Sequence, residues 1–203
     1  TQGKMDAEPI ATYDMVWPAT NHTFTTYVAD GETKELGATT NNTDATAKLE
    51  YVSSDKSIAE VDESGDVTAN GVGTAKITIT SKANGNWNAG KKVITVTVTK
   101  AANPMTAKAK KASVAASLKT LKSKAVTLAA NVTVSKAKGK VTYANASSNA
   151  TAKKFKVNAT TGKVTVPKGT AKGTYVLKVK VTAKGNGTYK AASKTVSYKV
   201  VVK

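Results

Sequence analysis

An internal repeat constrains the fold of this chain more than any other feature. Residues 51–100 and 143–203 carry the same features in the same order at nearly the same spacing. The matched features are Ser64-Gly65-Asp66-Val67-Thr68 with Thr161-Gly162-Lys163-Val164-Thr165, Gly73-Thr74 with Gly173-Thr174, and Gly85-Asn86 with Gly185-Asn186. Because self-similarity at a fixed period marks repeated structural units, the sequence predicts two copies of one unit.

Alternation of apolar and polar residues predicts that both copies are built of β-strands. In 175–182, Tyr175, Leu177, Val179 and Val181 share one face and the intervening residues share the other, as in a half-buried strand. The same period of two recurs in 77–79, 94–98 and 196–202. The one helical candidate is 107–124, where Val114, Leu118 and Leu121 would form a short apolar stripe. The sequence therefore predicts an all-β fold.

Charge divides the chain at the repeat boundary. The 31 basic residues are all lysine, and the formal net charge is +18. Residues 1–100 contain 9 lysines and 13 carboxylates, whereas residues 101–203 contain 22 lysines and no carboxylate side chain. The chain has no cysteine and a single histidine, so thiol chemistry and histidine-based metal centres are excluded. General acid–base catalysis in the second half would depend on lysine or tyrosine alone. We expect no enzyme and no cofactor.

The motifs of the first copy resemble those of bacterial immunoglobulin-like domains of group 2, which also occur in intimin-like and invasin-like surface proteins. They comprise Tyr51 with Ser53-Ser54-Asp55, Ser57-Ile58-Ala59-Glu60-Val61-Asp62, Ser64-Gly65-Asp66-Val67-Thr68-Ala69, and Gly71-Val72-Gly73-Thr74-Ala75. The second copy is similar to lysine-rich repeats of Firmicutes surface proteins, although it has no aspartate in its first turn. The resemblance implies β-sandwiches used for display, spacing or adhesion.

Together these features predict two tandem immunoglobulin-like β-sandwiches, at 10–100 and 105–203. Residues 1–9 remain unplaced, and a short linker around 99–104, with Pro104, joins the copies semi-rigidly in line. We expect a monomeric stalk, spacer or adhesion module of a secreted or cell-surface Gram-positive protein. The alternative is a carbohydrate- or host-protein-binding module that uses exposed aromatic residues of the first domain. No stretch resembles a membrane span or a secretory signal, which fits a mature chain or a fragment.

Two groups in the first copy are weak site candidates. Asp62, Glu63 and Asp66 could offer oxygens to a calcium ion, but they lack the ligand spacing of an EF-hand, so a solvated hairpin turn is favoured. Trp17 has no counterpart in the repeat and is the better candidate for surface contact, whereas Trp87 aligns with Tyr189 and predicts a packing role. His22 is expected in an exposed polar loop. An intramolecular Lys–Asn crosslink stays open in the first copy only, because it requires a carboxylate.

The lysines of the second copy are the remaining candidates for binding, with Lys178 and Lys180 on the outer face of a strand. Nucleic acid is disfavoured because the chain has no arginine for bidentate base contacts and no aromatic residues interleaved with the lysines. A solvated surface that resists strand addition explains the same placement. If a partner exists, we expect anionic cell-wall polymers such as teichoic acid, host acidic glycans or host proteins.

Overall fold

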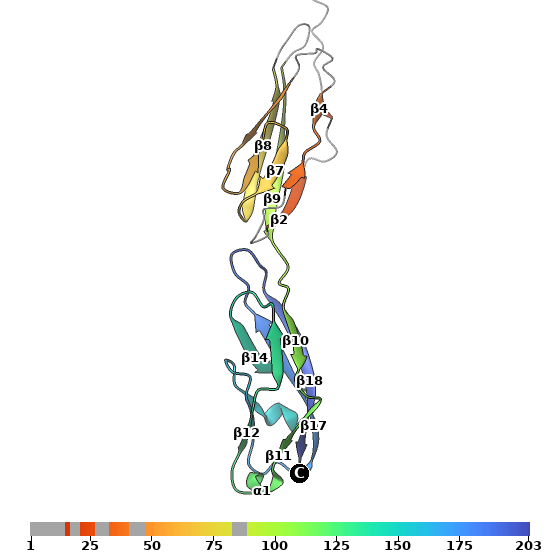
Figure 1. The fold of residues 1–203 in the computed structure, drawn as a ribbon, viewed down its shortest axis with the longest axis vertical. Coiled ribbons are helices and arrows are strands. Elements are labelled where there is room, and N and C mark those ends of the chain that lie inside the picture. Colours follow the sequence, from red (N-terminus) through yellow and green to blue (C-terminus); the bar gives the residue numbers. More distant parts are fainter. Residues whose placement is uncertain (1–14, 17–20, 27–32, 41–47, 83–88) are drawn as a thin grey trace, which may run out of the picture. The chain divides into compact units, whose positions relative to one another are not determined.

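The chain divides into two compact units, Thr1–Ala101 and Ala102–Lys203, and each has its own hydrophobic core (Figure 1). The computed structural model describes residues 15–16, 21–26, 33–40, 48–82 and 89–203. In the described part of the chain, no helix is long and apolar enough to cross a membrane.

The described residues of the first unit form three β-sheets. A four-stranded sheet has the order β2-β9-β8-β5, a three-stranded sheet has the order β3-β7-β6, and β1 pairs with β4. The strands are β1 (Met15–Val16), β2 (Asn21–Thr26), β3 (Thr33–Glu35), β4 (Thr39–Thr40), β5 (Leu49–Ser53), β6 (Ala59–Val61), β7 (Asp66–Ala69), β8 (Gly73–Ser81) and β9 (Gly90–Lys100).

The second unit repeats this plan strand for strand. Its four-stranded sheet has the order β11-β18-β17-β14, its three-stranded sheet has the order β12-β16-β15, and β10 pairs with β13. The elements are β10 (Thr106–Ala109), β11 (Ser113–Ala116), α1 (Leu118–Leu121), β12 (Val126–Leu128), β13 (Val132–Ser135), β14 (Val141–Asn145), η1 (Ala152–Lys154), β15 (Lys156–Val157), β16 (Val164–Val166), β17 (Gly173–Ala183) and β18 (Ala192–Val202). The internal repeat in the sequence is therefore a repeat of sheet topology.

In both units the only parallel strand pair within the described residues joins an early strand to the last strand. β2 runs parallel to β9 over six residue pairs, and β11 runs parallel to β18 over four. In the second unit the chain first pairs β10 antiparallel with β13 and then crosses to β18. The buried side chain of Asn131 holds this crossing, because its Oδ1 accepts from the Lys111 N–H at 3.0 Å and its Nδ2 donates to the Lys111 carbonyl at 2.8 Å.

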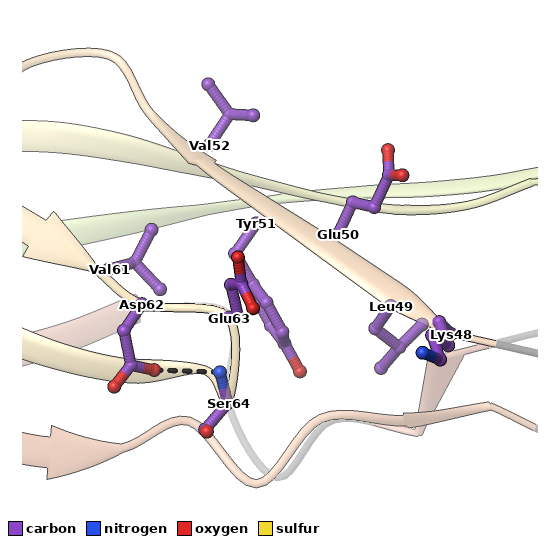
Figure 2. A pocket seen from close by; sticks show the side chains of 9 residues that line it. All are labelled: Lys48, Leu49, Glu50, Tyr51, Val52, Val61, Asp62, Glu63 and Ser64. Carbon is purple, nitrogen blue, oxygen red and sulfur yellow. Dashed lines mark hydrogen bonds between the residues drawn. The ribbon is translucent and has the colours of Figure 1, made fainter.

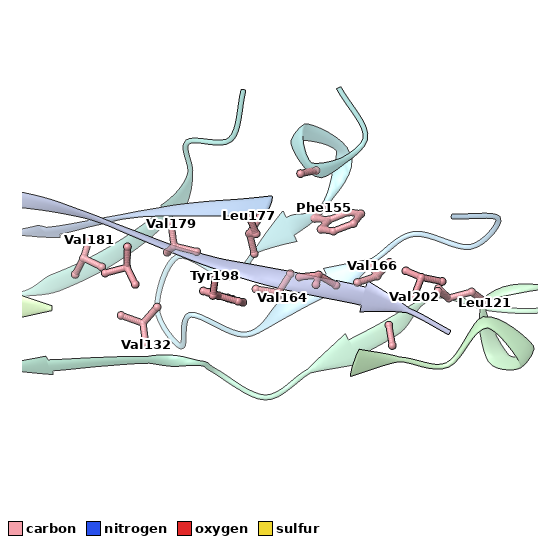
Figure 3. Packing of buried hydrophobic residues seen from close by; sticks show 14 of the residues in the cluster. Leu121, Val132, Phe155, Val164, Val166, Leu177, Val179, Val181, Tyr198 and Val202 are labelled. Atoms are coloured by element: carbon pink, nitrogen blue, oxygen red, sulfur yellow. The ribbon is translucent and has the colours of Figure 1, made fainter. Parts of the chain in front are cut away.

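The alternation predicted from the sequence places one face of each long strand in a core. Leu177, Val179 and Val181 of β17 are fully buried, and Tyr198 of β18 is 4% exposed (Figure 3). Ile77, Ile79, Ile94, Val96 and Val98 fill the equivalent core of the first unit. These strand predictions are confirmed.

The turn motif of the repeat has a glycine with positive φ in both copies, although the turn of the second copy is one residue longer. Gly65 and Gly162 have φ of 87° and 70°, which favours glycine over any residue with a Cβ. A Cβ atom on Gly65 would lie 2.8 Å from Cζ of Tyr51, and one on Gly162 would lie 3.2 Å from Cδ1 of Tyr143. Glycine therefore lets a tyrosine ring lie close against the turn in each unit.

Three local predictions differ from the structure. The helical candidate 107–124 contains parts of two strands, β10 and β11, which find hydrogen-bonding partners in β13 and β18, and only Leu118–Leu121 is helical. His22 belongs to β2, where it is paired with Val96, and not to a loop. The expected linker 99–104 begins inside β9, which extends to Lys100.

The end of that expected linker is part of the second unit. Asn103 Nδ2 donates to the carbonyls of Lys138, at 2.9 Å, and Lys190, at 3.1 Å. Its Oδ1 accepts from the backbone N–H groups of Met105 and Lys138. One asparagine thus joins the start of the unit to two segments that lie far away in the sequence.

Candidate functional site

The acidic turn between β6 and β7 is held together by its own carboxylate. Asp62 Oδ1 accepts from the backbone N–H groups of Ser64 and Asp66, both at 2.9 Å. The backbone closes the same turn through hydrogen bonds from Asp62 N to Asp66 O and from Gly65 N to Asp62 O. An aspartate that accepts from nearby N–H groups is a common stabiliser of turns. The carboxylate of Asp62 therefore stabilises the turn to which it belongs.

The three acids named as a weak calcium candidate lie in one turn, but their arrangement does not form a cage of oxygens. Asp62 directs Oδ1 at backbone donors (Figure 2). Among the residues that the structure describes, no group of three or more His, Cys, Asp or Glu side chains lies close enough to hold a metal ion. A role for Glu63 and Asp66 as ligands stays a prediction.

Beside this turn lies a hollow of about 980 Å³ in the first unit (Figure 2). It is bounded by β5 and by the β6–β7 turn, and its lining residues are Lys48, Leu49, Glu50, Tyr51, Val52, Val61, Asp62, Glu63 and Ser64. The lining combines three carboxylates with one lysine and several apolar side chains. Val52 is 62% exposed, more than Val72, Val93 or Val176.

Tyr51 lies at the centre of the hollow and is electrostatically biased toward its neutral form. Burial raises the pKa of its phenol, and the negative charges of Glu35 and Asp62 raise this pKa further. A neutral phenol in this position can donate one hydrogen bond and present an apolar ring. Glu50, at the edge, is already engaged, because its Oε1 lies 2.6 Å from Nζ of Lys82. The hollow is therefore a shallow acidic surface with an aromatic floor.

The two lysines predicted on the outer face of a strand are on that face. Lys180 of β17 is exposed and Lys178 is half-buried, and both alternate with the fully buried Leu177, Val179 and Val181. Across the ladder, Lys178 is opposite Ser197 and Lys180 is opposite Thr195. The placement predicted from the alternation is thus present, whereas contact of these lysines with a ligand stays a prediction. Trp17 and Trp87 lie outside the described residues.

Sequence reasoning did not anticipate the asparagines that organise the second unit. Oδ1 of Asn149 accepts from Thr151 N and Ala152 N, Oδ1 of Asn158 accepts from Thr160 N and Thr161 N, and Oδ1 of Asn186 accepts from Thr188 N and Tyr189 N. Each spans two or three residues, which is the local pattern of an Asx turn. The recurrence of Asn two residues before Thr was the available signal. Asparagine stabilises turns in this unit as aspartate does in the first.

Comparison with protein families finds a match within the first unit. Residues 19–93 match the family model for the bacterial Ig-like domain (group 2). The resemblance seen in the motifs of the first copy is therefore confirmed over these residues. Similarity of the second copy to lysine-rich surface repeats stays a prediction. No curated protein sequence matches the chain.

Among solved structures, similar chains include fragments of cadherins. The crystal structure of mouse cadherin-23 EC22-24 is 15% identical, with a TM-score of 0.41, over 94% of this chain and 65% of that one. Drosophila N-cadherin EC1-4 is 13% identical, with a TM-score of 0.41, over 95% of this chain and 50% of that one. Human protocadherin-24 EC1-2 is 15% identical, with a TM-score of 0.43, over 94% and 98%. The chain thus spans about two thirds and half of the first two fragments.

Proposed function

We propose that the chain is a non-enzymatic, load-bearing module of a secreted or cell-surface protein. In this proposal it consists of two tandem immunoglobulin-like β-sandwiches, at 10–100 and 105–203, that act as a stalk, spacer or adhesion unit. The match of residues 19–93 to bacterial Ig-like domains of group 2 supports the surface role. The repeated strand order supports the tandem, because both units arrange their four-stranded and three-stranded sheets in the same way.

The parallel pairing of terminal strands carries this proposal. In the second unit, Lys199 N donates to Ala112 O at 2.9 Å, Lys203 N donates to Ala116 O at 3.2 Å, and Leu118 N donates to Lys203 O at 2.8 Å. Tension between the ends of the unit pulls β11 and β18 in opposite directions along their common axis. All the hydrogen bonds of a parallel pair are then loaded at once, whereas an antiparallel hairpin pulled at its open end breaks them one by one. β2 and β9 have the same relation in the first unit.

Single-molecule stretching of the full chain between its two ends tests the proposal. We expect two separate unfolding events, and each should release about 300–350 Å of chain, because a unit has roughly 100 residues and an extended residue spans about 3.5 Å. A single event for the whole chain, or release of length without a force peak, would contradict a load-bearing role.

A second pulling geometry supplies the control. The chain has no cysteine, so an engineered cysteine gives a unique attachment point. Lys172 immediately precedes β17, whose first residue Gly173 is opposite Val202 near the end of β18. A Lys172→Cys variant held at residue 172 and at the C-terminus would open the β17–β18 ladder from one end. We expect a clearly lower unfolding force than in end-to-end pulling, and equal forces would overturn the mechanical role of the parallel pair.

The hollow beside Tyr51 favours a second candidate function, binding of a carbohydrate or a host protein by the first unit. Its exposed Val52, aromatic floor and carboxylates are the kind of mixed surface that contacts a partner. A glycan array and a panel of serum proteins probed with the full chain would test it. Binding that is lost in Val52→Thr supports the hollow, and binding that is lost only in Trp17→Ala would place the contact elsewhere.

A further inference from the structure

The outer face of the four-stranded sheet in the second unit is hydroxyl-rich and basic. Leu177, Val179, Tyr198 and Val200 point into the core, so their neighbours along β17 and β18 point outward (Figure 3). The outward residues of these two strands are Thr174, Val176, Lys178, Lys180, Thr182, Ser193, Thr195, Ser197, Lys199 and Val201. We call this set the lysine face.

The register between β17 and β18 places three lysines, Lys178, Lys180 and Lys199, close enough together on the lysine face to contact one extended ligand. Lys178 and Lys180 are two residues apart on one strand, which separates their Cα atoms by about 7 Å. Lys199 lies on the neighbouring strand opposite Val176, diagonal to Lys178. Hydroxyl groups fill the positions between them, and Thr182 Oγ1 lies 3.0 Å from Ser193 Oγ. The face therefore offers a row of cations with hydrogen-bonding groups beside them.

The charges of the lysine face have no anionic side chain in their own unit. Residues 101–203 contain 22 lysines and no aspartate or glutamate. The two ion pairs found among the described residues, Lys56 with Glu60 and Lys82 with Glu50, both lie in the first unit. A field of one sign attracts an external polyanion and adds to its association rate.

We propose that the lysine face binds a linear phosphodiester polymer of the cell envelope. Lysine is a point-charge binder of phosphate, whereas paired recognition of planar carboxylates favours arginine, which the chain does not contain. No aromatic side chain is among the outward residues, so nucleobases would find no stacking surface. A phosphodiester backbone without bases fits the surface best. The envelope as its source rests on the proposed surface role.

The first unit provides an internal comparison for this surface. Ser54 N donates to Lys76 O as Ala146 N donates to Lys178 O, both at 2.8 Å. In the sheets Lys76 is therefore equivalent to Lys178, and not to Val176 as the match of Gly73 with Gly173 in the sequence would suggest. The registers of β8 with β9 and of β17 with β18 then make Thr78 equivalent to Lys180, and Thr97 equivalent to Lys199. The equivalent positions in the first unit thus keep one of the three lysines. Threonine is compatible with the same strand positions and favours β structure.

Binding of the full chain to immobilised poly(glycerol phosphate), measured against salt concentration, tests the proposal. The test variant Lys180→Thr/Lys199→Thr installs the residues of the first unit. The control Lys108→Thr/Lys156→Thr removes two exposed lysines from β10 and β15, which belong to other sheets. We expect the test variant to bind about tenfold more weakly at low salt and to show a shallower salt slope by about 0.7 for each lysine–phosphate pair removed. We expect the control to change affinity less than threefold.

Several outcomes would overturn the proposal. Equal losses in the two variants would mean that only net charge matters, and absence of binding at low salt would exclude the ligand class. Tighter binding of oligo(dT) than of poly(glycerol phosphate) at equal charge would point to nucleic acid, and equal binding of polygalacturonate would remove the preference for phosphate. Circular dichroism of both variants checks that the sheets are intact. These results leave the stretching experiment unaffected, so the two proposals fail separately.

Discussion

Asn158 in the second unit and Asp62 in the first stabilise the same turn with the same atom. Each residue directs Oδ1 at two backbone N–H groups, and each also accepts through its carbonyl from the N–H of the turn glycine, Gly162 or Gly65. The hydrogen bonds need an oxygen and not a charge. Replacing aspartate by asparagine therefore preserves the turn while it removes a group that titrates in acid.

Gly139 is the residue at which we expect a single methyl group to be most damaging. Its φ is 86°, and a Cβ atom would overlap the backbone carbonyl oxygen of Gly185, which cannot move aside as a side chain can. Gly169 has a similar φ of 80°, but a Cβ atom there would have no other atom within 4 Å. We expect Gly169→Ala to cost about 1 kcal/mol and Gly139→Ala about 3 kcal/mol or more in the free energy of unfolding of the second unit. Urea denaturation of the two variants measures the difference, and equal costs would contradict it.

Tyr198 gives the second unit a sensitivity to strongly alkaline pH. Burial raises the pKa of its phenol to about 12 from the ordinary value of 10.0. Between these two values the unfolded chain loses the proton and the folded chain keeps it, so the contribution of Tyr198 to stability falls as pH rises. Titration followed by phenolate absorbance should show a tyrosine that ionises near pH 12 and is missing in Tyr198→Phe. A chain in which all tyrosines ionise near pH 10 while folded would refute this.

At the scale of the element, alternation predicted the strands well because each long strand has one buried face. β17 and β18 bury every second residue over most of their length, so the alternation of apolar and polar residues is enough to locate these strands in the sequence. The pattern did not decide the segment 107–124, because alanine and lysine tolerate both helix and strand. Its strands are decided by partners that lie far away in the sequence, in β13 and β18, and no local pattern contains that information.

The candidate surfaces were predictable to a different extent. The outward position of Lys178 and Lys180 follows from alternation alone, but the addition of Lys199 requires the register between β17 and β18. Likewise, the hollow is lined by β5 and by the later β6–β7 turn, and the packing of Tyr51 against Gly65 helps to bring these segments together. Spacing in the sequence predicts which residues point outward, whereas the pairing of strands determines which of them lie on the same surface.

The connection between β5 and β6 provides a prediction at the same scale. Asp55 accepts from both the hydroxyl and the N–H of Ser57, and these hydrogen bonds lower the pKa of its carboxyl. A lowered pKa means that the stabilisation is present above the ordinary value of 3.8 and is lost as pH falls through the lower folded value. We expect Asp55→Asn, which keeps the acceptor, to weaken the dependence of the first unit's urea midpoint on pH between 4 and 2. Glu60→Gln on neighbouring β6 is the control, and an equal effect would contradict the role of the turn.

At the scale of the whole molecule, charge distinguishes the two units more than topology does. The strand order is repeated, but the first hundred residues contain all 13 carboxylate side chains and the rest contain none. The first hundred residues have more carboxylates than lysines, whereas residues 101–203 have 22 lysines and no carboxylate side chain whose protonation could change their charge. A module of this kind can present a permanent cationic surface next to a unit whose charge depends on acidity.

Acid should therefore separate the stability of the two units. Lowering the pH from 7 to 2.5 weakens the charged hydrogen bonds that Ser57 donates to Asp55, and it reduces the negative charge that opposes the 9 lysines of the first hundred residues. The turns of the second unit, held by Asn149, Asn158 and Asn186, have no group that titrates in this range. We expect urea unfolding of the full chain, followed residue by residue by NMR, to show a midpoint that falls for the first unit and changes little for the second. Added salt should restore part of the first unit's loss by screening its lysines. A larger fall in the urea midpoint of the second unit than of the first would contradict this prediction. It would mean that repulsion between lysines dominates the stability of the second unit, and that its asparagine turns do not protect it from acid.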